Sequence, residues 1–303
     1  ITGTNDAPVI SGAATGAVIA ETDAAGLTAA GTLSLGDLDR SDTLSSQVAG
    51  VSIRAGSATA GLDAGLLANT GNALGALMSV SGSLDGASTS GALDWSFDSG
   101  VHSFDYLAVG ESLVLDYTVR VTDSGAHGAV STDQTVTITI TGTNDAPAIT
   151  LGAGDTATAD LTETDAALVA SGTLDLGDLD RSDTVSVAVS GLAVSGSGPR
   201  AGLALGDAQL ASMLSVASGA IIDAAGTTGG FGWSFDSDAG GLGEAFDHLA
   251  TGETLVLAYA VTATDSQGAS DIQTVTITIT GTNDAPVISG AATGAVIAET
   301  DAA

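Results

Sequence analysis

Aspartates at turns are the side chains of this sequence that could do chemistry. The string Gly-Asp-Leu-Asp-Arg-Ser-Asp-Thr occurs twice, and its first copy places Asp37, Asp39 and Asp42 just after an expected strand. Residues two apart in extended backbone point to one face, so the carboxylates of Asp37 and Asp39 are expected to leave together, and Asp42 can fold back toward them. Two unpaired carboxylates about 4 Å apart repel by roughly 1 kcal/mol in water. A hard divalent cation such as Ca²⁺, which takes oxygen ligands, would cancel that repulsion.

The pattern is not an EF-hand, and it leaves a second interpretation open. An EF-hand loop needs glycine at its sixth place and glutamate at its twelfth, where this chain has Asp42 and Val48. Aspartates at turns also commonly accept hydrogen bonds from nearby backbone N–H groups while they remain solvated. One such cluster taken alone therefore fits a calcium site and a set of solvated turn residues equally well.

A long internal repeat sets how the acidic turns are distributed. Residues 1–25 return unchanged as residues 279–303, and Thr-Gly-Thr-Asn-Asp-Ala-Pro begins at Thr2, Thr141 and Thr280, 139 residues apart. That length matches one domain and is too long for a solenoid repeat that needs its neighbours to fold. We therefore predict an array whose domains are residues 1–143 and residues 144–282, followed by the truncated start of a third repeat at residues 283–303.

Alternation of apolar and polar residues predicts an all-β fold for each unit. Residues 134–141 and 273–280 alternate with period two, and each follows a second alternating run, at 112–121 and 254–263, so that a hairpin closes each unit. Further candidate strands are residues 9–10, 17–20, 31–35, 48–53, 77–81 and 93–97. Together they approach the roughly seven strands of an Ig-like β-sandwich, with Trp95 and Trp233 as core residues. Residues 207–214 have helical spacing and predict a short helical insertion in the sandwich.

The composition excludes several classes of partner and chemistry. The chain has 36 acidic residues and 5 basic ones, none of them lysine, for a formal charge of −31, which excludes nucleic acid and anionic membranes as expected partners. Hydrophobic residues make up 44% of the chain, which indicates a folded protein and not an acidic disordered one. The absence of cysteine removes disulfides, thiol catalysis and zinc–thiolate sites. The uncharged stretch at residues 64–84 is too polar for a membrane span, so no membrane insertion is expected.

The acidic turns fall at the two ends of a sandwich whose strands run alternately up and down. One end of the first unit would carry Asp37, Asp39, Asp42 and Asp123. The other end would carry Glu21, Asp23, Asp105, Glu111 and the linker residues Asn144 and Asp145. The next unit would bring to this junction Asp178, Asp180, Asp183 and Asp265. Carboxylates from two domains and the linker would then meet in one cation site.

The start of the third repeat supplies only half of such a junction. The residues at the end of the second unit are Glu163 and Asp165, and the linker that follows contributes Asn283 and Asp284. The aspartates of a following unit are not among the residues of this sequence. We therefore expect calcium to bind less completely there than at the first junction.

Several segments resemble known extracellular repeats. Residues 138–147, Ile-Thr-Ile-Thr-Gly-Thr-Asn-Asp-Ala-Pro, look like the strand and linker that end a cadherin repeat, and residues 36–42 stand at the place of the cadherin Asp-x-Asp turn. Two further long segments match each other: FDYLAVGESLVLDYTVRVTDSGA, which begins at Phe104, and FDHLATGETLVLAYAVTATDSQGA, which begins at Phe246. In combination these segments resemble the VCBS repeats of very large, RTX-type bacterial surface adhesins. The similarity covers almost the whole of both units.

The resemblance implies tandem Ig-like, cadherin-like Greek-key sandwiches that are exported to the bacterial surface by type I secretion, with Ca²⁺ at the junctions. The unit departs from cadherins in its extra central segment and in a linker that is one acidic or amide residue shorter than the animal form. The expected function is a calcium-stiffened spacer of a giant adhesin in cell adhesion and biofilm formation. Its expected partners are the adjacent repeats and, through distant domains, surface or matrix ligands. The alternatives are a unit that itself binds a glycan or a protein, and a surface-layer or matrix scaffold.

Enzymatic interpretations have little support in the residues. Asp105 with Glu111, or Asp247 with Glu253, could be imagined as the carboxylate pair of a glycoside hydrolase, but aromatic residues that could stack on a sugar make up only 3% of the chain. The histidines stand at different positions of the repeat: His102, His127 and His248. No lysine exists to complete a phosphate-binding loop. We therefore expect that the chain is not an enzyme.

Overall fold

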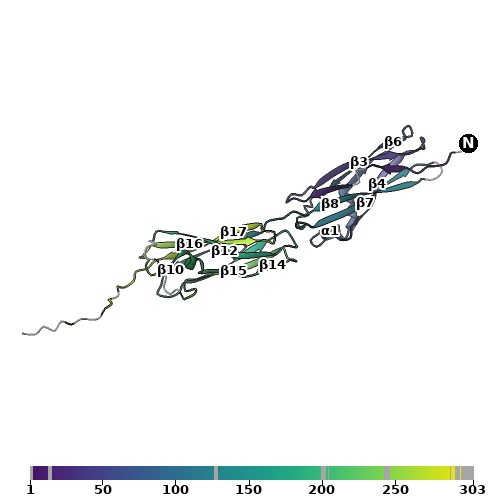
Figure 1. Ribbon diagram of the computed structural model, residues 1–303. Helices are drawn as coiled ribbons and strands as arrows, with labels where there is room; N and C mark the ends of the chain where they lie inside the picture. Colours follow the sequence, from purple (N-terminus) through teal and green to yellow (C-terminus); the bar gives the residue numbers. More distant parts are fainter. Residues whose placement is uncertain are drawn as a thin grey trace, which may run out of the picture.

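The computed structural model describes residues 3–12, 16–125, 129–198, 203, 205–241, 246–286, 288–290 and 294. These residues form four sheets, two in each repeat, and the two resulting β-sandwiches follow one another along an elongated molecule (Figure 1). The all-β fold class that alternation predicts is confirmed. The domain limits at residues 143 and 282 stay a prediction, and most of the expected third repeat lies outside the described residues.

The first sandwich is built from two four-stranded sheets. One sheet has the strand order β1 (Val9–Ser11), β3 (Thr28–Gly36), β6 (Ser90–Asp98) and β5 (Met78–Ser81). The other has the order β2 (Gly16–Ala20), β8 (Ser131–Thr141), β7 (Ser112–Asp123) and β4 (Leu44–Ile53). Strands β7 and β8 form the expected antiparallel hairpin, whereas β2 runs parallel to β8. Alternation of side chains is the same in either direction, so the pattern that predicts a strand does not predict this parallel pairing.

The second sandwich repeats this arrangement. One sheet has the order β13 (Leu214–Val216), β15 (Thr228–Asp236), β11 (Val169–Gly177) and β9 (Ala148–Thr150). The other has the order β10 (Thr158–Thr162), β17 (Ser270–Thr280), β16 (Thr254–Thr264), β12 (Val185–Gly196) and β14 (Ala220–Ile222). The edge strand β10 is parallel to β17, as β2 is to β8.

Short helices interrupt each sandwich. They are α1 (Ala64–Leu67) with the 3₁₀ turns η1 (Thr70–Asn72) and η2 (Gly75–Leu77) in the first unit, and α2 (Asp207–Ala211) in the second. The helix expected over residues 207–214 is shorter than predicted, because Leu214 begins β13 and pairs with Phe235 of β15. The buried hydroxyl of Tyr259 donates to the carbonyl of Leu210 at 2.9 Å and so ties α2 to the sheet.

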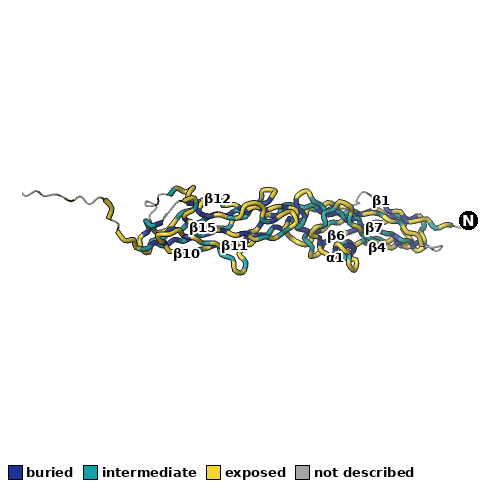
Figure 2. The backbone as a smooth tube through the Cα atoms, turned by 90° about the horizontal axis from the view of Figure 1, so that it is seen from below, coloured by how far each residue is buried: buried dark blue, intermediate teal, exposed yellow. Residues whose placement is uncertain are grey.

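The core of each sandwich lies between its two sheets, and Figure 2 shows the buried residues along the inner faces of the strands. Trp95 and Trp233 are each 2% exposed, which confirms their place in the core. Gly31 and Gly172 make room for these rings, because a Cβ added to either glycine would overlap the neighbouring indole. Among the described residues, no helix combines the length and the apolar composition needed to cross a membrane.

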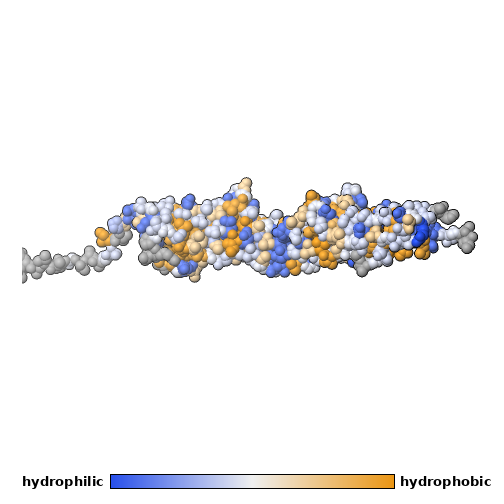
Figure 3. Space-filling view, turned by 90° about the horizontal axis from the view of Figure 1, so that it is seen from above, coloured by the Kyte–Doolittle hydropathy of each residue, from blue (hydrophilic) through white to orange (hydrophobic). Residues whose placement is uncertain are grey.

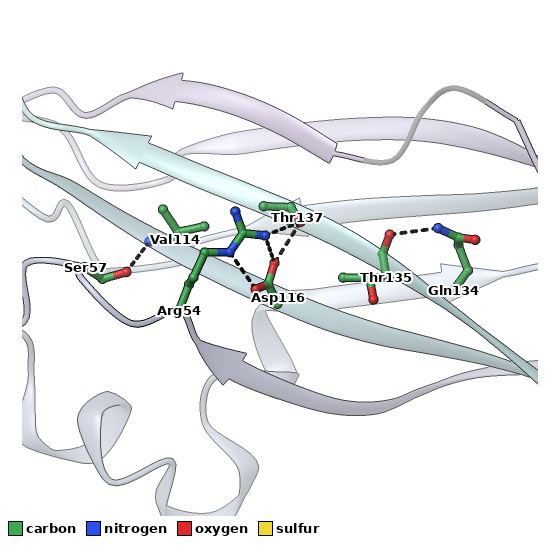
Figure 4. Close-up of polar contacts among 7 residues, drawn as sticks. All are labelled: Arg54, Ser57, Val114, Asp116, Gln134, Thr135 and Thr137. Atoms are coloured by element: carbon green, nitrogen blue, oxygen red, sulfur yellow. Dashed lines mark hydrogen bonds and ion pairs between the residues drawn. The ribbon is translucent and has the colours of Figure 1, made fainter.

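Two arginines each form an ion pair with an aspartate on the outer face of the first sandwich. Arg54 donates from Nε and Nη2 to the carboxylate of Asp116, at 2.9 and 2.5 Å, and Thr137 donates to the same carboxylate at 2.8 Å (Figure 4). The hydrogen bond from Arg54 holds the pKa of Asp116 below its ordinary value of 3.8. Arg120 and Asp133 form a second pair, with both bonds at 2.7 Å. These pairs lie along the strands, away from the acidic turns at the ends of the sandwich.

Candidate metal centre between the repeats

The linker leaves β8 at Gly142 and is held by a buried glutamate of the first sandwich. Gly142 has no room for a side chain, because a Cβ there would overlap the carbonyl oxygens of Leu107 and Ala108. Thr143 donates its backbone N–H and its hydroxyl to Oε1 of Glu21, at 2.7 and 2.5 Å. Glu21 is 1% exposed, and its other oxygen, Oε2, has no hydrogen-bond partner among the described residues. The linker therefore fixes one carboxylate oxygen and leaves the second available.

The next two linker residues bind the second sandwich. The backbone N–H of Asp145 donates to Oδ2 of Asp180 at 2.7 Å, and Nδ2 of Asn144 donates to Oδ2 of Asp265 at 2.9 Å. The other oxygen of Asp265 accepts three backbone N–H groups of its own turn, at 2.6 to 2.9 Å. Asp265 therefore has a full set of donors and acts as an anchor for the Asn144 side chain.

The aspartates of the second Gly-Asp-Leu-Asp-Arg-Ser-Asp-Thr string lie in a bend. The N–H of Asp180 donates to Oδ1 of Asp178 at 3.0 Å, and the N–H of Asp183 donates to the carbonyl of Asp180 at 3.1 Å. The extended backbone that the spacing suggested is therefore not what brings these carboxylates together. The bend buries all three, with exposures of 4%, 0% and 3% in chain order.

Seven side-chain oxygens at the joint are buried and have no hydrogen-bond partner among the described residues. They are Glu21 Oε2, Asp105 Oδ1, Asn144 Oδ1, Asp145 Oδ2, Asp178 Oδ2, Asp180 Oδ1 and Asp183 Oδ2. A buried acceptor without a donor costs about 1–3 kcal/mol, and more when it is charged, so these oxygens call for partners. Carboxylate and amide oxygens are the ligands that Ca²⁺ prefers. The residues present therefore fit a hard divalent cation.

The pKa values of the joint show that its carboxylates crowd one another. Burial, followed by the charges of Glu21, Asp23 and Asp105, raises the pKa of Asp145 to about 7. Burial is also the largest cause for Asp180, whose pKa rises to about 7, and for Asp178, whose pKa rises to about 6. Asp145 of the linker and Asp178 and Asp180 of the second sandwich thus resist ionising in the absence of a cation.

Two further acidic residues of the first sandwich lie beside this cluster. Asp23 is exposed, and Asp105 is half-buried with its Oδ2 accepting the hydroxyl of Ser103 at 2.7 Å. Both raise the pKa of Asp145, so both lie within reach of the linker. Asp105 could offer its Oδ1 to a cation at the joint, whereas the exposed Asp23 would bind such a cation from the solvent side.

Glu111 lies in the turn beneath the linker, and its role as a cation ligand stays a prediction. Its Oε2 accepts the N–H of Ala108 at 3.2 Å inside its own turn, and its carbonyl accepts the N–H of Gly142 at 3.0 Å. It is not among the residues with an oxygen that lacks a donor. Glu111 therefore supports the turn beneath the linker.

The two outer ends of the molecule each hold part of the same arrangement. At the N-terminal end, carboxylate oxygens of Asp37, Asp42 and Asp123 lie within 4.8 Å of one another. The linker copy there makes the same bonds, because Asp6 donates its N–H to Asp39 at 2.6 Å and Asn5 donates to Asp123 at 3.1 Å. Burial, followed by the neighbouring aspartates, raises the pKa of Asp42. What this end lacks, among the described residues, is a counterpart of Glu21.

The C-terminal end holds the complementary part. Oxygens of Glu163, Asp165 and Asp284 lie within 4.8 Å of one another, and Thr282 donates its N–H and hydroxyl to Glu163 at 2.9 and 2.8 Å. Asp284 and Asn283 are exposed, whereas the equivalent Asp145 is buried. The pKa of Asp284 is raised by its partial loss of hydration and by Glu163. The linker copies at the two ends of the described chain thus repeat the hydrogen bonds that the middle linker makes to one sandwich or the other.

Sequence reasoning missed four residues of this arrangement. Thr143 and Thr282 orient the glutamates, and Asn5 and Asp6 repeat the linker bonds at the N-terminal end. The signal was present, because the whole string Thr-Gly-Thr-Asn-Asp-Ala-Pro recurs and its second threonine recurs with it. The threonines were not predicted because candidate cation ligands are acidic and amide side chains, whereas Thr143 and Thr282 act by orienting such side chains.

Neither of the two described histidines, His102 and His248, is part of a carboxylate group that could hold a metal. The ring of His102 lies 6.3 Å from that of Phe104. Nε2 of His248 is buried, with no partner among the described residues, and His127 lies outside them. The described histidines therefore belong to different surroundings, in line with their different positions in the repeat.

Comparisons with known proteins show similarity at the level of solved structures. No family model matches the chain, and no curated protein matches it. An ectodomain structure of protocadherin gamma B2, cadherin domains 1–5, is 13% identical with a TM-score of 0.38, and the match covers 93% of this chain and 41% of that one. A protein of unknown function from Porphyromonas gingivalis W83 is 10% identical with a TM-score of 0.26 over 90% and 99% of the two chains. The CooA pilin subunit from enterotoxigenic Escherichia coli is 15% identical with a TM-score of 0.28, over 46% and 100%.

The chain spans about two fifths of the length of the protocadherin chain it matches. Identities and TM-scores this low carry no inference about function, so a role for the joint rests on the residues of the joint itself.

Proposed function

We propose that this chain belongs to the spacer region of a large bacterial surface adhesin, and that Ca²⁺ held between successive repeats stiffens it. The observation that carries the proposal is the set of seven buried oxygens without donors between the two sandwiches. Glu21 and Asp105 would hold the ion from the first sandwich, Asn144 and Asp145 from the linker, and Asp178, Asp180 and Asp183 from the second sandwich. When bound, the ion supplies the positive charge that these carboxylates otherwise lack.

The residues of the joint decide whether it is flexible or rigid. Without a cation, ionised carboxylates on both sandwiches would repel one another, and this repulsion would weaken the hydrogen bonds that hold the linker. A bound cation would neutralise these charges and link oxygens of the first sandwich, the linker and the second sandwich, which would restrict bending of the linker. Thr143 keeps Glu21 in place for this role, and Asp265 does the same for Asn144. A series of such joints would hold a distant binding domain away from the cell surface, a non-enzymatic role.

Removing calcium from the two-unit chain is expected to shorten its maximum dimension and to broaden its distribution of shapes. The physical reason is that repulsion between the carboxylates opens the joint, while each sandwich keeps its own hydrophobic core. Small-angle X-ray scattering with calcium and with a chelator measures this change.

Magnesium is the matched control for the scattering experiment. Mg²⁺ demands octahedral geometry and gives up its water reluctantly, so it should not extend the chelated chain at the same concentration. A maximum dimension that is the same with calcium and with chelator would sink the spacer proposal.

Calcium binding is expected to release protons near neutral pH. In the calcium-free chain the raised pKa values of Asp145 and Asp180, both about 7, keep these carboxylates partly protonated. A raised carboxylate pKa means that the calcium-free joint loses stability as pH rises from the ordinary value of 3.8 through about 7. Since Ca²⁺ needs ionised ligands, more protons should leave per ion at about pH 6 than at about pH 8.5.

Titration calorimetry in two buffers of different ionisation enthalpy counts these protons at each pH. The titration at about pH 8.5, above both raised pKa values, is the control. Equal proton release at both pH values would show that these carboxylates are ionised before calcium arrives.

A further inference from the structure

We propose that residues 179–181 of the second sandwich, the docking loop, bind the end of the first sandwich directly and fix the relative orientation of the two units. This inference rests on the proposed function, because it concerns the same joint, and it adds a contact made by the protein alone. Residues 61–66 and 101–106 of the first sandwich form the docking face. The loop and the face line one groove of about 430 Å³ beside the carboxylate cluster, in which Leu179 and Arg181 stand opposite Leu62, Leu66 and Phe104.

The contact point on the docking face is rigid. The N–H of Arg181 donates to the carbonyl of Tyr106 at 3.4 Å across the joint. Tyr106 is fixed from behind, because its hydroxyl donates to the carbonyl of Ala58 at 3.0 Å. Its side chain also packs against Gly61, whose φ of +109° suits glycine and where a Cβ would lie 2.7 Å from the Tyr106 Cβ. The residue whose carbonyl receives the docking loop is therefore held by Ala58 and Gly61, in the segment that precedes α1.

The chain contains its own control for the effect of docking. The same eight-residue string occurs in both units, and the linker makes the same bonds to it in both. Leu38, which no sandwich precedes among the described residues, is 79% exposed, whereas Leu179 is 52% exposed. Likewise Arg40 is exposed and Arg181 half-buried. Since sequence and linker are shared, the difference is made by the sandwich that precedes the second copy.

The chemistry of the groove differs from that of the carboxylate cluster next to it. Figure 3 shows a hydrophilic band at the waist of the molecule with hydrophobic patches on either side. Leu179 brings an apolar side chain to the groove, where Leu62, Leu66 and Phe104 are buried. Arg181, one of only 5 basic residues in the chain, stands in the same groove as Asp63 and Asp105. Apolar burial and an arginine among carboxylates both favour contact without a cation.

The test is a distance distribution between the two sandwiches. The chain has no cysteine, so Thr135→Cys in β8 and Thr274→Cys in β17, both at exposed positions, would carry the only two spin labels. With calcium, the otherwise unchanged chain should show one narrow distance peak by pulsed electron paramagnetic resonance. Leu179→Asp should lose that narrow peak, whereas Leu38→Asp, the same change in the same string, should keep it.

Folding of the variants is checked by thermal unfolding, and Leu179→Ser is the second variant if Leu179→Asp unfolds early. A narrow peak in both Leu179 variants would overturn the docking proposal, and so would an equal loss of the peak in Leu38→Asp.

Repeating the measurement with chelator separates the two proposals. One outcome is that the labelled parent chain gives a narrow distance peak only with calcium, and that Leu179→Asp also gives a narrow peak with calcium. Docking would then be refuted, and the calcium proposal would stand. The opposite outcome is that the labelled parent chain gives an equally narrow distance peak with calcium and with chelator, whereas Leu179→Asp gives a broad distribution in both. Docking would then stand, and calcium stiffening would be refuted.

Discussion

Replacing Asp178 and Asp180 together by asparagine is expected to abolish tight calcium binding at the joint while leaving both sandwiches folded. Both side chains are buried, and each has an oxygen without a donor. Residues that only support a ligand typically change metal affinity by about 10- to 100-fold, so losing two ligand charges should weaken binding by at least about 100-fold. Calcium titration by calorimetry on the two-unit chain measures this loss.

The sandwiches themselves should tolerate the change. The pKa values of Asp178 and Asp180 are raised, to about 6 and about 7, so the calcium-free fold already disfavours their charged forms. Neutral asparagines of the same shape remove that penalty. The calcium-free double variant is therefore expected to melt at the same temperature as the calcium-free parent, or higher.

The matched control lies in the first copy of the string. Asp37→Asn with Asp39→Asn makes the same two changes at the outer end of the molecule, where no sandwich precedes them among the described residues. This control should leave the affinity of the joint unchanged. The ligand assignment fails if the joint variant binds calcium as tightly as the parent, or if both pairs of substitutions weaken the same site.

Gly142→Ala is expected to destabilise the first sandwich and to disturb the joint at the same time. The added Cβ would overlap the carbonyl oxygens of Leu107 and Ala108, which belong to a turn and cannot move independently. Overpacking of this kind typically costs about 1–3 kcal/mol. A shift of the linker would also break the two hydrogen bonds from Thr143 to Glu21. We expect a lower melting temperature by calorimetry together with weaker calcium binding.

Two other glycines test whether the effect comes from this close approach. Gly281→Ala places a Cβ against the carbonyl oxygens of Leu249 and Ala250, so it should destabilise the second sandwich in the same way. Gly50→Ala has no heavy atom within 4 Å of the added Cβ and should have little effect. If Gly142→Ala melts like Gly50→Ala, the close packing of the linker against the turn does not matter for stability.

The strands could be predicted because their signal is local. Period-two alternation in residues 134–141 and 273–280 predicts strands that the structure confirms as the C-terminal parts of β8 and β17, with inward residues such as Ile138 and Ile277 fully buried. The direction of the edge strands was not predictable in this way, because β2 and β10 carry the same alternation whichever way they run. The end of α2 was missed because pairing with β15 outweighs helical spacing at Leu214.

The sequence by itself determined that acidic turns, linker and repeat length belong together, since the whole string Thr-Gly-Thr-Asn-Asp-Ala-Pro recurs every 139 residues beside the aspartates. Only the tertiary structure decided which carboxylate oxygens have donors. Thr143 reaches Glu21 across 122 residues of chain, and Asn144 reaches Asp265 across 121. The same holds for the docking loop, because identical strings at residues 36–43 and 177–184 differ in burial through the sandwich that precedes one of them. A residue type states what a side chain can bind, whereas its partners are set by contacts between segments that no local pattern encodes.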